Sequence, residues 1–536
     1  MTPTPTNIQP PAAPLPSPDA GLLWRRTLWL ILGITLARIL YLVFWCPYTL
    51  IEDEAHYWEW ARRLEWSYYT KGPGVAWAIA ASTRLLGMQH EYSVRIPAAI
   101  SAGITTLLVA MIARDTYRCA RTAFFAACVL LAAPMFQSLG LMMTIDSPYA
   151  ACWALAMWSG WKALGQNRPR WLALTGAAIG VGALFKYTIL LSLPGLIAAA
   201  WMQRRERPYR GFAPWLAIGL LLFVVGMSPI IIWNAREGWP TIAHLLGHLG
   251  LKGGDMPVQQ GDGHGFHYNP LWTLGFIGTQ LGMIGPVLLI AGGQVAAWRR
   301  SPRTSSDHDA ERFLITNSIP IIAFYLLVSF VAEPEGNWPL AGYITLFPLA
   351  ARRVAQADFS PGGRLTRLVW KIAIVIGLAV ALVFPRLDLL AKLPVIGPLI
   401  PVHRFTGADR MAADVQRHAD ALAAATGKKP FIIAVHYGRA SQLAFYLKDN
   451  PTVYCASSLI EDGRRTQYDY WVDTNLRHQP DLIGRPAVVA GGSQAAWEPY
   501  FEQLKPIGTL DGDGKKNRPA FEGIGFRGFG SGKGAR

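Results

Sequence analysis

Long apolar segments separated by short polar loops are the feature that most restricts how this chain can fold. A helix of about 20 apolar residues is long enough to cross the hydrocarbon core of a bilayer. Segments that approach this length recur through most of the chain: 22–46, 93–113, 121–142, 147–164, 171–185, 187–202, 211–233, 271–297, 313–332, 339–352 and 367–385. We therefore predict a polytopic α-helical membrane protein with about 11 to 13 transmembrane helices.

The composition agrees with this fold class. Charged residues make up 16% of the chain and hydrophobic residues 52%, whereas soluble domains average about 25% charged residues. The 21 tryptophans suit the aromatic belts that membrane proteins place at the bilayer interface. The net charge of +16 arises largely from basic residues in short loops, so it indicates membrane topology, and we expect no nucleic-acid partner.

The arginine-rich loops predict the orientation of the chain in the membrane. Cytoplasmic loops carry an excess of Lys and Arg. If the N-terminus is cytoplasmic, every dense arginine group lies on the cytoplasmic side: those within 114–121, 168–170, 204–210, 299–312 and 352–367. An apolar stretch at 73–88 contains Arg84 and would reverse this agreement if it crossed the bilayer. We therefore expect that stretch to form an interfacial or re-entrant helix.

The sequence changes character at both ends of the apolar region. Residues 1–20 are rich in Pro, Thr and Ala and predict a disordered cytoplasmic tail. Residues 21–402 predict the membrane domain, with interfacial helices in the first outer loop at 48–90. Residues 403–510 predict a small periplasmic α/β domain, and residues 511–536, rich in Gly, Lys and Arg, predict a flexible tail.

The α/β assignment rests on alternating helix and strand patterns after the last apolar segment. An amphipathic helix is predicted at 411–426, and a second helix at 441–448. Short buried-strand patterns occur at 431–435 and 487–490. Such alternation is typical of a sheet covered by helices, so we expect a separate folded domain on the outer side.

Three consecutive acids, Glu52, Asp53 and Glu54, follow the first apolar segment. A charge in lipid is costly unless it faces water or a polar cavity, so acids at the end of a membrane helix are functional candidates. Asp53 has a structural alternative, because Asp is a favourable N-cap for the helix that would follow. A carboxylate at this place can accept a proton from a hydroxyl or an amine, or bind a metal.

Cations at the outer ends of the apolar segments form a second group of candidates. Lys71 precedes a Gly-Pro-Gly turn whose backbone N–H groups would favour a phosphate, although contact with lipid headgroups is the alternative. Arg95 and Lys186 would each either join a phosphate clamp or serve as a boundary charge. Asp146, close to Pro148, is either a helix N-cap or a functional acid.

A short outer turn contains two acids, an amide and an aromatic ring: Glu333, Glu335, Asn337 and Trp338. Acids that bind hydroxyl groups and a ring that stacks on C–H groups suit a sugar, whereas a polar turn with an interfacial Trp is the alternative. His244 and His248 have the i, i+4 spacing of zinc ligands, but no metal motif accompanies them. We expect helix-surface histidines, no metal site and no required cofactor, although the acids would be compatible with a divalent cation.

Five short motifs follow one another on the predicted outer side of the chain. These are Asp53–Tyr57, Tyr69–Pro73, Ile145–Pro148, Ala183–Tyr187 and Glu335–Pro339. The ordered set resembles the GT-C glycosyltransferases, in particular the bacterial branch related to protein O-mannosyltransferases and the lipid A aminoarabinose transferase. The likeness covers about residues 25–350.

The resemblance implies a GT-C fold and an integral membrane glycosyltransferase of the bacterial inner membrane. Such an enzyme would move a sugar from a polyprenyl-phosphate donor, such as undecaprenyl phosphate, to an extracytoplasmic acceptor. The acceptor would be lipid A, another glycan or lipid, or a protein. The active site and the C-terminal domain would then be periplasmic and the N-terminus cytoplasmic.

The resemblance also implies roles for the candidate residues. Asp53 would be the base that activates the acceptor. Two further acids would shape the site: Glu54 and Asp146. The donor phosphate would be bound, and stabilised as it leaves, by three cations: Lys71, Arg95 and Lys186. The substrates would contact five more side chains: Tyr57, Tyr69, Glu335, Asn337 and Trp338.

Two other functions remain as alternatives. A transporter or flippase for a lipid-linked substrate would place its acids near the bilayer midplane in repeated halves, whereas here the acids lie at one interface and no repeat is evident. A receptor or scaffold that acts through the outer domain would leave the acidic loop unexplained. Gly72 and Ser147 depart from the family pattern beside Lys71 and Asp146, which leaves the donor sugar open.

Overall fold

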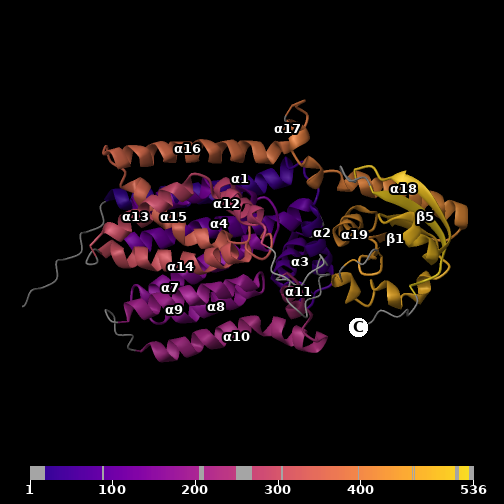
Figure 1. Cartoon of the computed structure of the whole chain (residues 1–536), viewed down its shortest axis with the longest axis horizontal. Helices are drawn as coiled ribbons and strands as arrows, with labels where there is room; N and C mark the ends of the chain where they lie inside the picture. The colour runs from indigo at the N-terminus through magenta and orange to yellow at the C-terminus, as the bar shows by residue number, and fades with distance from the viewer. Residues whose placement is uncertain are drawn as a thin grey trace, which may run out of the picture.

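The computed structural model describes residues 18–86, 90–204, 211–248, 268–302, 306–395, 397–460, 463, 465–512 and 518–529. Figure 1 shows an elongated bundle of helices with a smaller domain at one end, which contains a β-sheet. The tail predicted at 1–20 lies mostly outside the described residues. Its last residues are helical, because the first helix begins at Pro18.

Helices form at every apolar segment that the sequence predicted to span the membrane. The bundle contains α1 (Pro18–Phe44), α4 (Glu91–Tyr117), α5 (Ala120–Leu131), α6 (Pro134–Ser138), α7 (Asp146–Leu164), α8 (Trp171–Ala183), η1 (Tyr187–Leu191), α9 (Ser192–Gln203), α10 (Phe212–Glu237), α12 (Pro270–Ile284), α13 (Val287–Arg300), α14 (Ser306–Val328), α15 (Leu340–Ala355) and α16 (Pro361–Val383). The predicted fold class is therefore confirmed as a helical membrane bundle with a small C-terminal sheet domain.

The number of full-length spans differs from the prediction. Among the described residues, five helices are long and apolar enough to cross a membrane, or six if α12 and α13 count as one broken span. Those two helices meet at an angle of 98°. The prediction was about 11 to 13 transmembrane helices, and two of its apolar segments are broken in the structure. Pro134 begins α6 after a break from α5, and Gly285-Pro286 separates α12 from α13.

The outer helices of the bundle present apolar side chains outwards. In the most apolar part of α1, only 22% of the residues are buried. The corresponding share is 17% for α10 and for α16. Figure 1 shows α10 and α16 along opposite sides of the bundle. Soluble proteins rarely expose apolar surface on this scale, whereas lipid tails cover it without cost. The structure thus agrees with a multi-span membrane protein.

The interior of the bundle is closely packed. One large cluster of buried side chains joins α4, α5, α7, α14 and α15, and it includes Trp153, Phe313 and Phe347. A Cβ atom at Gly176 of α8 would clash with the carbonyl oxygen of Gly219 of α10. Small residues of this kind allow membrane helices to approach closely.

The loop between α1 and α4, predicted to be the first outer loop, folds into two short helices at the end of the bundle. These are α2 (Glu52–Arg62) and α3 (Gly74–Leu86), and α11 (Pro240–His248) lies beside them (Figure 1). At 13 residues, α3 rises about 20 Å, less than the roughly 30 Å of a bilayer core. Its length therefore agrees with the prediction that this stretch does not cross the membrane.

A short irregular connector leads from the bundle to the C-terminal domain. It contains η2 (Phe384–Arg386), α17 (Leu387–Leu390), η3 (Gly397–Leu399) and η4 (Val402–Arg404). Large apolar side chains on it are exposed, among them Leu393 and Leu399. This pattern agrees with the expected position at a membrane surface.

The C-terminal domain is a five-stranded mixed sheet in the order β2-β1-β3-β5-β4. Its elements are α18 (Ala408–Thr426), β1 (Phe431–Ala434), α19 (Tyr437–Tyr446), β2 (Val453–Cys455), η5 (Gln467–Asp469), η6 (Leu476–His478), η7 (Pro480–Leu482), β3 (Ala487–Ala490), α20 (Gln494–Trp497), η8 (Glu498–Tyr500), β4 (Phe501–Thr509) and β5 (Pro519–Phe526). Ile432 of β1 pairs in parallel with Val453 of β2 and Val488 of β3. The helices predicted at 411–426 and 441–448 and the strands predicted at 431–435 and 487–490 are present.

The prediction of a flexible tail at 511–536 is wrong for residues 519–526. These residues form β5, which lies between β3 and β4 and pairs with both of them in antiparallel fashion. Phe521 and Phe526 of this strand are buried. The domain therefore extends beyond the predicted boundary at residue 510, because its last strand completes the hydrophobic core.

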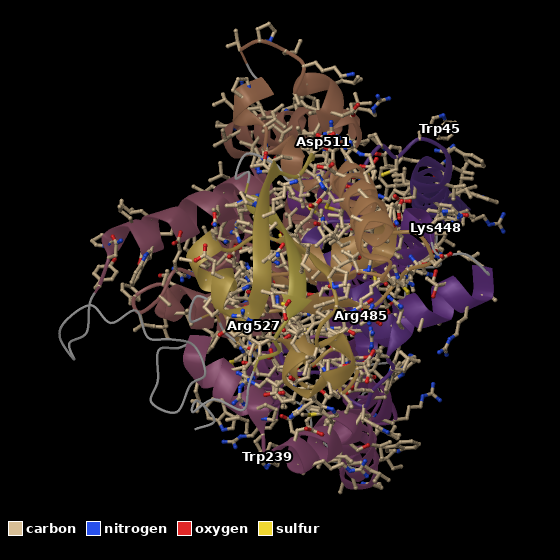
Figure 2. All side chains as sticks on the ribbon, turned by 90° about the vertical axis from the view of Figure 1, so that its right-hand side faces the viewer. Trp45, Trp239, Lys448, Arg485, Asp511 and Arg527 are labelled. Carbon is tan, nitrogen blue, oxygen red and sulfur yellow. The ribbon has the colours of Figure 1, made fainter. Side chains whose placement is uncertain are left out.

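The C-terminal domain packs on the loop between α1 and α4 through a shared core. Trp58 of α2 contacts Phe445 of α19, with ring centroids 4.9 Å apart. The same hydrophobic cluster includes Ile79 of α3 and Val488 of β3. Figure 2, seen from the end of the molecule, shows the sheet lying in front of the bundle. This packing fixes the domain against the acidic loop.

Candidate active site

The acidic segment forms the first turn of α2. Carboxylates there are favourable, because the N-terminus of a helix carries a partial positive charge. The residue that precedes the helix is Ile51, whose N–H donates to Oε2 of Glu54 at 3.1 Å. Asp53 therefore lies inside the helix, and the alternative interpretation of Asp53 as its N-cap is wrong.

Glu54 and Arg95 form an ion pair in the core of the molecule. Arg95 donates from Nε to Oε1 of Glu54 at 2.9 Å and from Nη2 to Oε2 at 2.6 Å. The side chains are 0% and 1% exposed. Arg95 also donates to the backbone carbonyls of Tyr48 and Thr49, and Glu54 accepts from the N–H of Met143. The pair ties α2 to α4, and neither residue lines the cavities described below.

The loop around Lys71 is held against the turn that contains Lys186. The N–H of Gly74 donates to the carbonyl oxygen of Leu184 at 2.9 Å. A Cβ atom at Gly72 would clash with the same carbonyl oxygen, so only glycine fits this close approach. The Lys71 ammonium is directed to the Tyr57 side chain, where Nζ donates to Oη at 2.8 Å. Two of the predicted motifs are thus brought together.

Asp146 joins two more of the predicted motifs. Its Oδ1 accepts from Nζ of Lys186 at 2.8 Å, and its Oδ2 accepts from the side-chain amide of Asn337 at 2.6 Å. Asp146 is almost fully buried at 3% exposed. Because both carboxylate oxygens are engaged, this acid holds Lys186 and Asn337 in place.

Burial and two nearby acids raise the pKa of the Tyr57 hydroxyl. Burial, together with the negative charges of Asp53 and Asp146, holds the pKa of Tyr57 well above its ordinary value. The hydroxyl therefore stays neutral at physiological pH. A neutral hydroxyl accepts a hydrogen bond from Lys71 while leaving the ammonium its full charge.

A cavity of about 220 Å³ opens beside these residues. Four of the predicted residues line it: Asp53, Tyr57, Lys71 and Trp338. The other lining residues are His56, Trp60, Thr70, His244, Tyr437, Arg465, Thr466 and Gln467. The cavity therefore combines a carboxylate, an ammonium group and aromatic rings, which suits a ligand with both a phosphate and a sugar.

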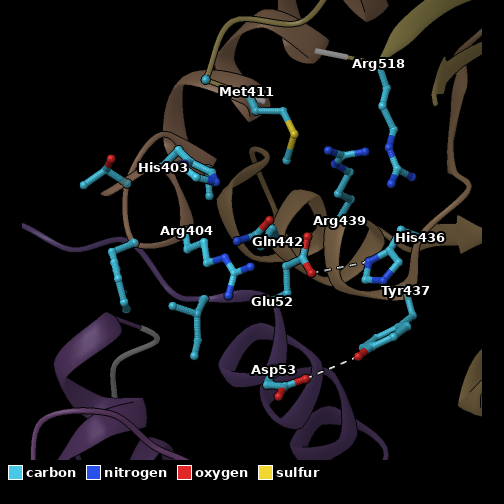
Figure 3. A pocket seen from close by; sticks show the side chains of 15 residues that line it. Glu52, Asp53, His403, Arg404, Met411, His436, Tyr437, Arg439, Gln442 and Arg518 are labelled. Atoms are coloured by element: carbon cyan, nitrogen blue, oxygen red, sulfur yellow. Dashed lines mark hydrogen bonds and ion pairs between the residues drawn. The ribbon is translucent and has the colours of Figure 1, made fainter. Parts of the chain in front are cut away.

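A second cavity of about 790 Å³ lies between α2 and the C-terminal domain (Figure 3). Asp53 and Tyr437 line both cavities. The Tyr437 hydroxyl donates to Oδ1 of Asp53 at 3.3 Å, as Figure 3 shows. The Asp53 carboxylate thus lies where the two cavities meet, in position to act on a ligand in either one.

Two predicted substrate contacts lie elsewhere. The Tyr69 ring is buried and packs against His244 and Tyr470, with centroids 5.1 Å and 5.2 Å apart. Glu335 is exposed in the turn before Trp338 and does not line either cavity. The structure therefore gives Tyr69 a packing role, and it leaves Glu335 at the surface.

The described residues contain no group of three or more His, Cys, Asp or Glu side chains arranged to hold a metal ion. The prediction of a helix-surface histidine is wrong for His244, which is 5% exposed and lies on the 220 Å³ cavity. The side chain of His248 lies outside the described residues.

Several residues of the site come from the C-terminal domain and were not predicted. Tyr437, Arg439 and Arg518 line the larger cavity, and Arg465 lines the smaller one. The sequence contains no local signal that this domain docks on α2.

Comparison with known proteins finds similarity to the same kind of enzyme. The profile of the family described as dolichyl-phosphate-mannose-protein mannosyltransferase matches residues 70–233. The lipid A galacturonosyltransferase RgtD of Rhizobium johnstonii is 27% identical over 81% of this chain and 84% of its own length. An undecaprenyl phosphate-alpha-4-amino-4-deoxy-L-arabinose arabinosyl transferase of Pseudomonas aeruginosa is 30% identical over 32% of each chain.

Solved structures show the same fold. The crystal structure of ArnT from Cupriavidus metallidurans in the apo state has a TM-score of 0.62 and 17% identity, and the match covers 93% of this chain and 98% of ArnT. The crystal structure of the same ArnT bound to undecaprenyl phosphate has a TM-score of 0.62 and 18% identity. That match covers 92% of this chain and 97% of ArnT. The helical bundle therefore has the GT-C fold, and the ordered motifs and these relatives make the chain similar to the GT-C glycosyltransferases.

Proposed function

We propose that this protein transfers a sugar from undecaprenyl phosphate, or a related polyprenyl phosphate, to an acceptor on the periplasmic side of the bacterial inner membrane. The observation that supports this most strongly is the 220 Å³ cavity at the end of the bundle, with Asp53 and Lys71 in its wall. A relative named for a lipid A transferase and a neighbour solved with undecaprenyl phosphate support the same substrates.

The Lys71 ammonium is proposed to bind the donor phosphate. It is a cation in the wall of the smaller cavity, and its hydrogen bond to Tyr57 fixes its direction. Charge builds up on the phosphate as the sugar leaves, and a cation held in place beforehand stabilises it most effectively. Lys186 is paired with Asp146, so we assign this pair to shaping the site. Arg95 is not part of the proposed phosphate site, because its guanidinium is buried against Glu54.

Asp53 is proposed to be the general base. An acceptor hydroxyl would lose its proton to the Asp53 carboxylate while its oxygen attacks the anomeric carbon of the sugar. The bond between that carbon and the phosphate oxygen breaks, and the electron pair leaves with the lipid phosphate. The hydrogen bond from Tyr437 would fix the orientation of the Asp53 carboxylate where the two cavities meet.

The orientation of the protein is proposed from the distribution of arginines. The arginine-rich loops fall on one side if the N-terminus is cytoplasmic, and the acidic loop then falls on the other. The site and the C-terminal domain would thus face the periplasm. A transporter or flippase has less support, because the named relatives are transferases.

A panel of donors tests the proposal. Purified protein in liposomes would be supplied with radiolabelled undecaprenyl-phosphate sugars and an acceptor lipid, and the wild type would be compared with Asp53→Asn. Loss of a general base lowers the rate about 10²- to 10⁴-fold. The exposed acid Asp481 provides the matched control, since Asp481→Asn changes the same group far from the cavities. Equal consumption of a donor by the wild type and Asp53→Asn would exclude Asp53 as the base.

A further inference from the structure

A chain of hydrogen bonds joins α2 to the C-terminal domain beside the smaller cavity. His56 follows Asp53 by three residues on α2, is 7% exposed and belongs to the wall of this cavity. Its Nδ1 lies 3.1 Å from Oγ of Ser441 in α19, and its Nε2 accepts from Nε1 of Trp60 at 3.1 Å. The Ser441 Oγ also lies 2.8 Å from the hydroxyl of Tyr468. Both nitrogens of the His56 ring are therefore engaged.

The direction of each hydrogen bond in this chain follows from its donors. An indole N–H only donates, so Nε2 of His56 is unprotonated and Nδ1 carries the proton. Nδ1 therefore donates to Ser441, whose own hydroxyl donates to the backbone carbonyl of Tyr437 at 2.9 Å. Burial holds the pKa of Tyr468 well above its ordinary value, and its hydroxyl is the donor to Ser441. His56 is thus neutral with both nitrogens occupied, which leaves it no role as a second general base.

The His56 ring also packs on Tyr437, the residue whose hydroxyl donates to Asp53. The centroids of the His56 and Tyr437 rings are 4.6 Å apart. Residues three apart lie on the same face of a helix, so Asp53 and His56 both face the Tyr437 side chain. Figure 3 shows this side chain extending from α19 to Asp53. Because Ser441 holds the backbone of Tyr437 and His56 contacts its ring, the place of His56 decides where the Tyr437 hydroxyl lies.

We propose that His56 is a positioning residue, which places the Tyr437 hydroxyl on the Asp53 carboxylate and so directs the proposed base at the acceptor. The inference rests on the proposed transferase function. Ser441 and Tyr437 both belong to α19, so the arrangement forms only when the C-terminal domain is docked on α2. A general base must lie within hydrogen-bond reach of the proton it removes. The C-terminal domain is therefore required to orient the base, in addition to lining the cavities.

Two variants of His56 test its role in the rate. His56→Leu removes the ring and both hydrogen bonds, whereas His56→Asn keeps an N–H close to the position of Nδ1. A hydrogen bond to a charged group changes a rate about tenfold at the low end. His56→Leu is expected to lower kcat about tenfold with both KM values unchanged, and His56→Asn to retain part of the rate. His478→Asn is the control, because His478 is exposed and lines neither cavity. A raised donor KM with an unchanged kcat would make His56 a substrate contact and overturn the inference.

A double-mutant cycle with Tyr437→Phe separates positioning from a general structural effect. Tyr437→Phe removes the hydroxyl that reaches Asp53 and is expected to lower kcat about tenfold. If His56 acts through that hydroxyl, adding His56→Leu to Tyr437→Phe lowers kcat no further. The same fold loss from His56→Leu in both backgrounds would show that His56 acts independently of Tyr437 and would overturn the inference.

A structure of the full-length His56→Leu protein in lipid nanodiscs tests the geometry without any turnover. The inference predicts that the Tyr437 hydroxyl lies beyond hydrogen-bond distance of Asp53, in place of the 3.3 Å of the wild type. Ser441→Ala removes only the hydroxyl between His56 and α19, so it is the milder second variant and carries the same prediction. An unchanged contact in both variants would overturn the inference. A lost contact in a protein whose wild type turns over no donor would sustain the positioning of Asp53 and reject the transferase function.

Discussion

Asp53 and Glu54 are neighbours in the sequence but occupy two different regions of the molecule. Asp53 borders two cavities, whereas Glu54 is fully buried against Arg95 in the core. Successive residues of a helix point about 100° apart, so one turn of α2 places one acid on each side. The contrast teaches that neighbouring acids can differ in role. Glu54 stabilises the fold through its ion pair, and Asp53 is the acid that a ligand can reach.

The largest effect on stability is expected from removing the buried acid, Glu54. Glu54→Gln leaves the Arg95 charge without its counter-ion, which costs about 3–5 kcal/mol in the free energy of unfolding. Thermal unfolding of the purified protein in detergent measures the loss. Glu52→Gln is the control, because Glu52 is half exposed in the same turn and its removal changes stability by about 0.5 kcal/mol or less. Equal destabilisation by both changes would contradict the division.

A change of Lys71 tests the proposed phosphate site on the cavity side of α2. Lys71→Met removes the cation proposed to stabilise the leaving phosphate and is expected to lower kcat about 10²- to 10³-fold. Lys71→Arg keeps the charge and should retain part of the rate. Lys448→Met is the control, since Lys448 is an exposed lysine that lines neither cavity. Steady-state transfer in liposomes measures all three, and an unaffected Lys71→Met would remove Lys71 from the mechanism.

Gly72 tests whether the cavity depends on the tight contact between two loops. A Cβ in Gly72→Ala would clash with the Leu184 backbone, and such overpacking costs about 1–3 kcal/mol. Gly275→Ala in α12 is the control, since nothing lies within 4 Å of a Cβ there. We expect a lower melting temperature and slower transfer for Gly72→Ala alone. Wild-type behaviour of Gly72→Ala would show that the loops do not need this contact.

The smallest effect is expected from Tyr57→Phe, which keeps the ring and removes the acceptor of the Lys71 hydrogen bond. One hydrogen bond from a charged donor contributes about 1.5 kcal/mol at the low end, so the rate should fall roughly tenfold. Because the pKa of Tyr57 is raised in the folded protein, its hydroxyl stays protonated below its ordinary pKa of 10.0. The pH–rate profiles of the wild type and Tyr57→Phe should therefore have the same shape below about pH 9. Loss of one limb of the profile in Tyr57→Phe would contradict this.

The bundle was predictable because membrane helices need long apolar segments, and each predicted segment became helical. The sequence did not reveal where helices break, since Gly285-Pro286 lies inside an apolar segment of span length. Strand β5 was missed for a different reason. Pro519, Gly523 and Gly525 dilute its apolar pattern, and its burial depends on pairing with β3 and β4.

That the ordered motifs lie together was predictable, as for Asp53 and Lys71, whereas the pairing of Lys186 with Asp146 was not predicted. Arg95 was assigned to the donor phosphate because a cation at the end of an apolar segment has the same sequence pattern whether it is exposed or buried. The arginines of the larger cavity escaped prediction because they depend on how the C-terminal domain docks on α2. Long-range docking of this kind leaves no spacing to recognise.

The most direct test of the central claim measures rate and stability together for the two neighbouring acids. Asp53→Asn and Glu54→Gln would each be assayed for single-turnover sugar transfer in liposomes and for thermal unfolding in detergent. The account predicts that Asp53→Asn unfolds like the wild type and transfers sugar at least about 100-fold more slowly, whereas Glu54→Gln is strongly destabilised. A destabilised Asp53→Asn, or one that transfers sugar at the wild-type rate, would contradict the assignment of Asp53 to the chemistry.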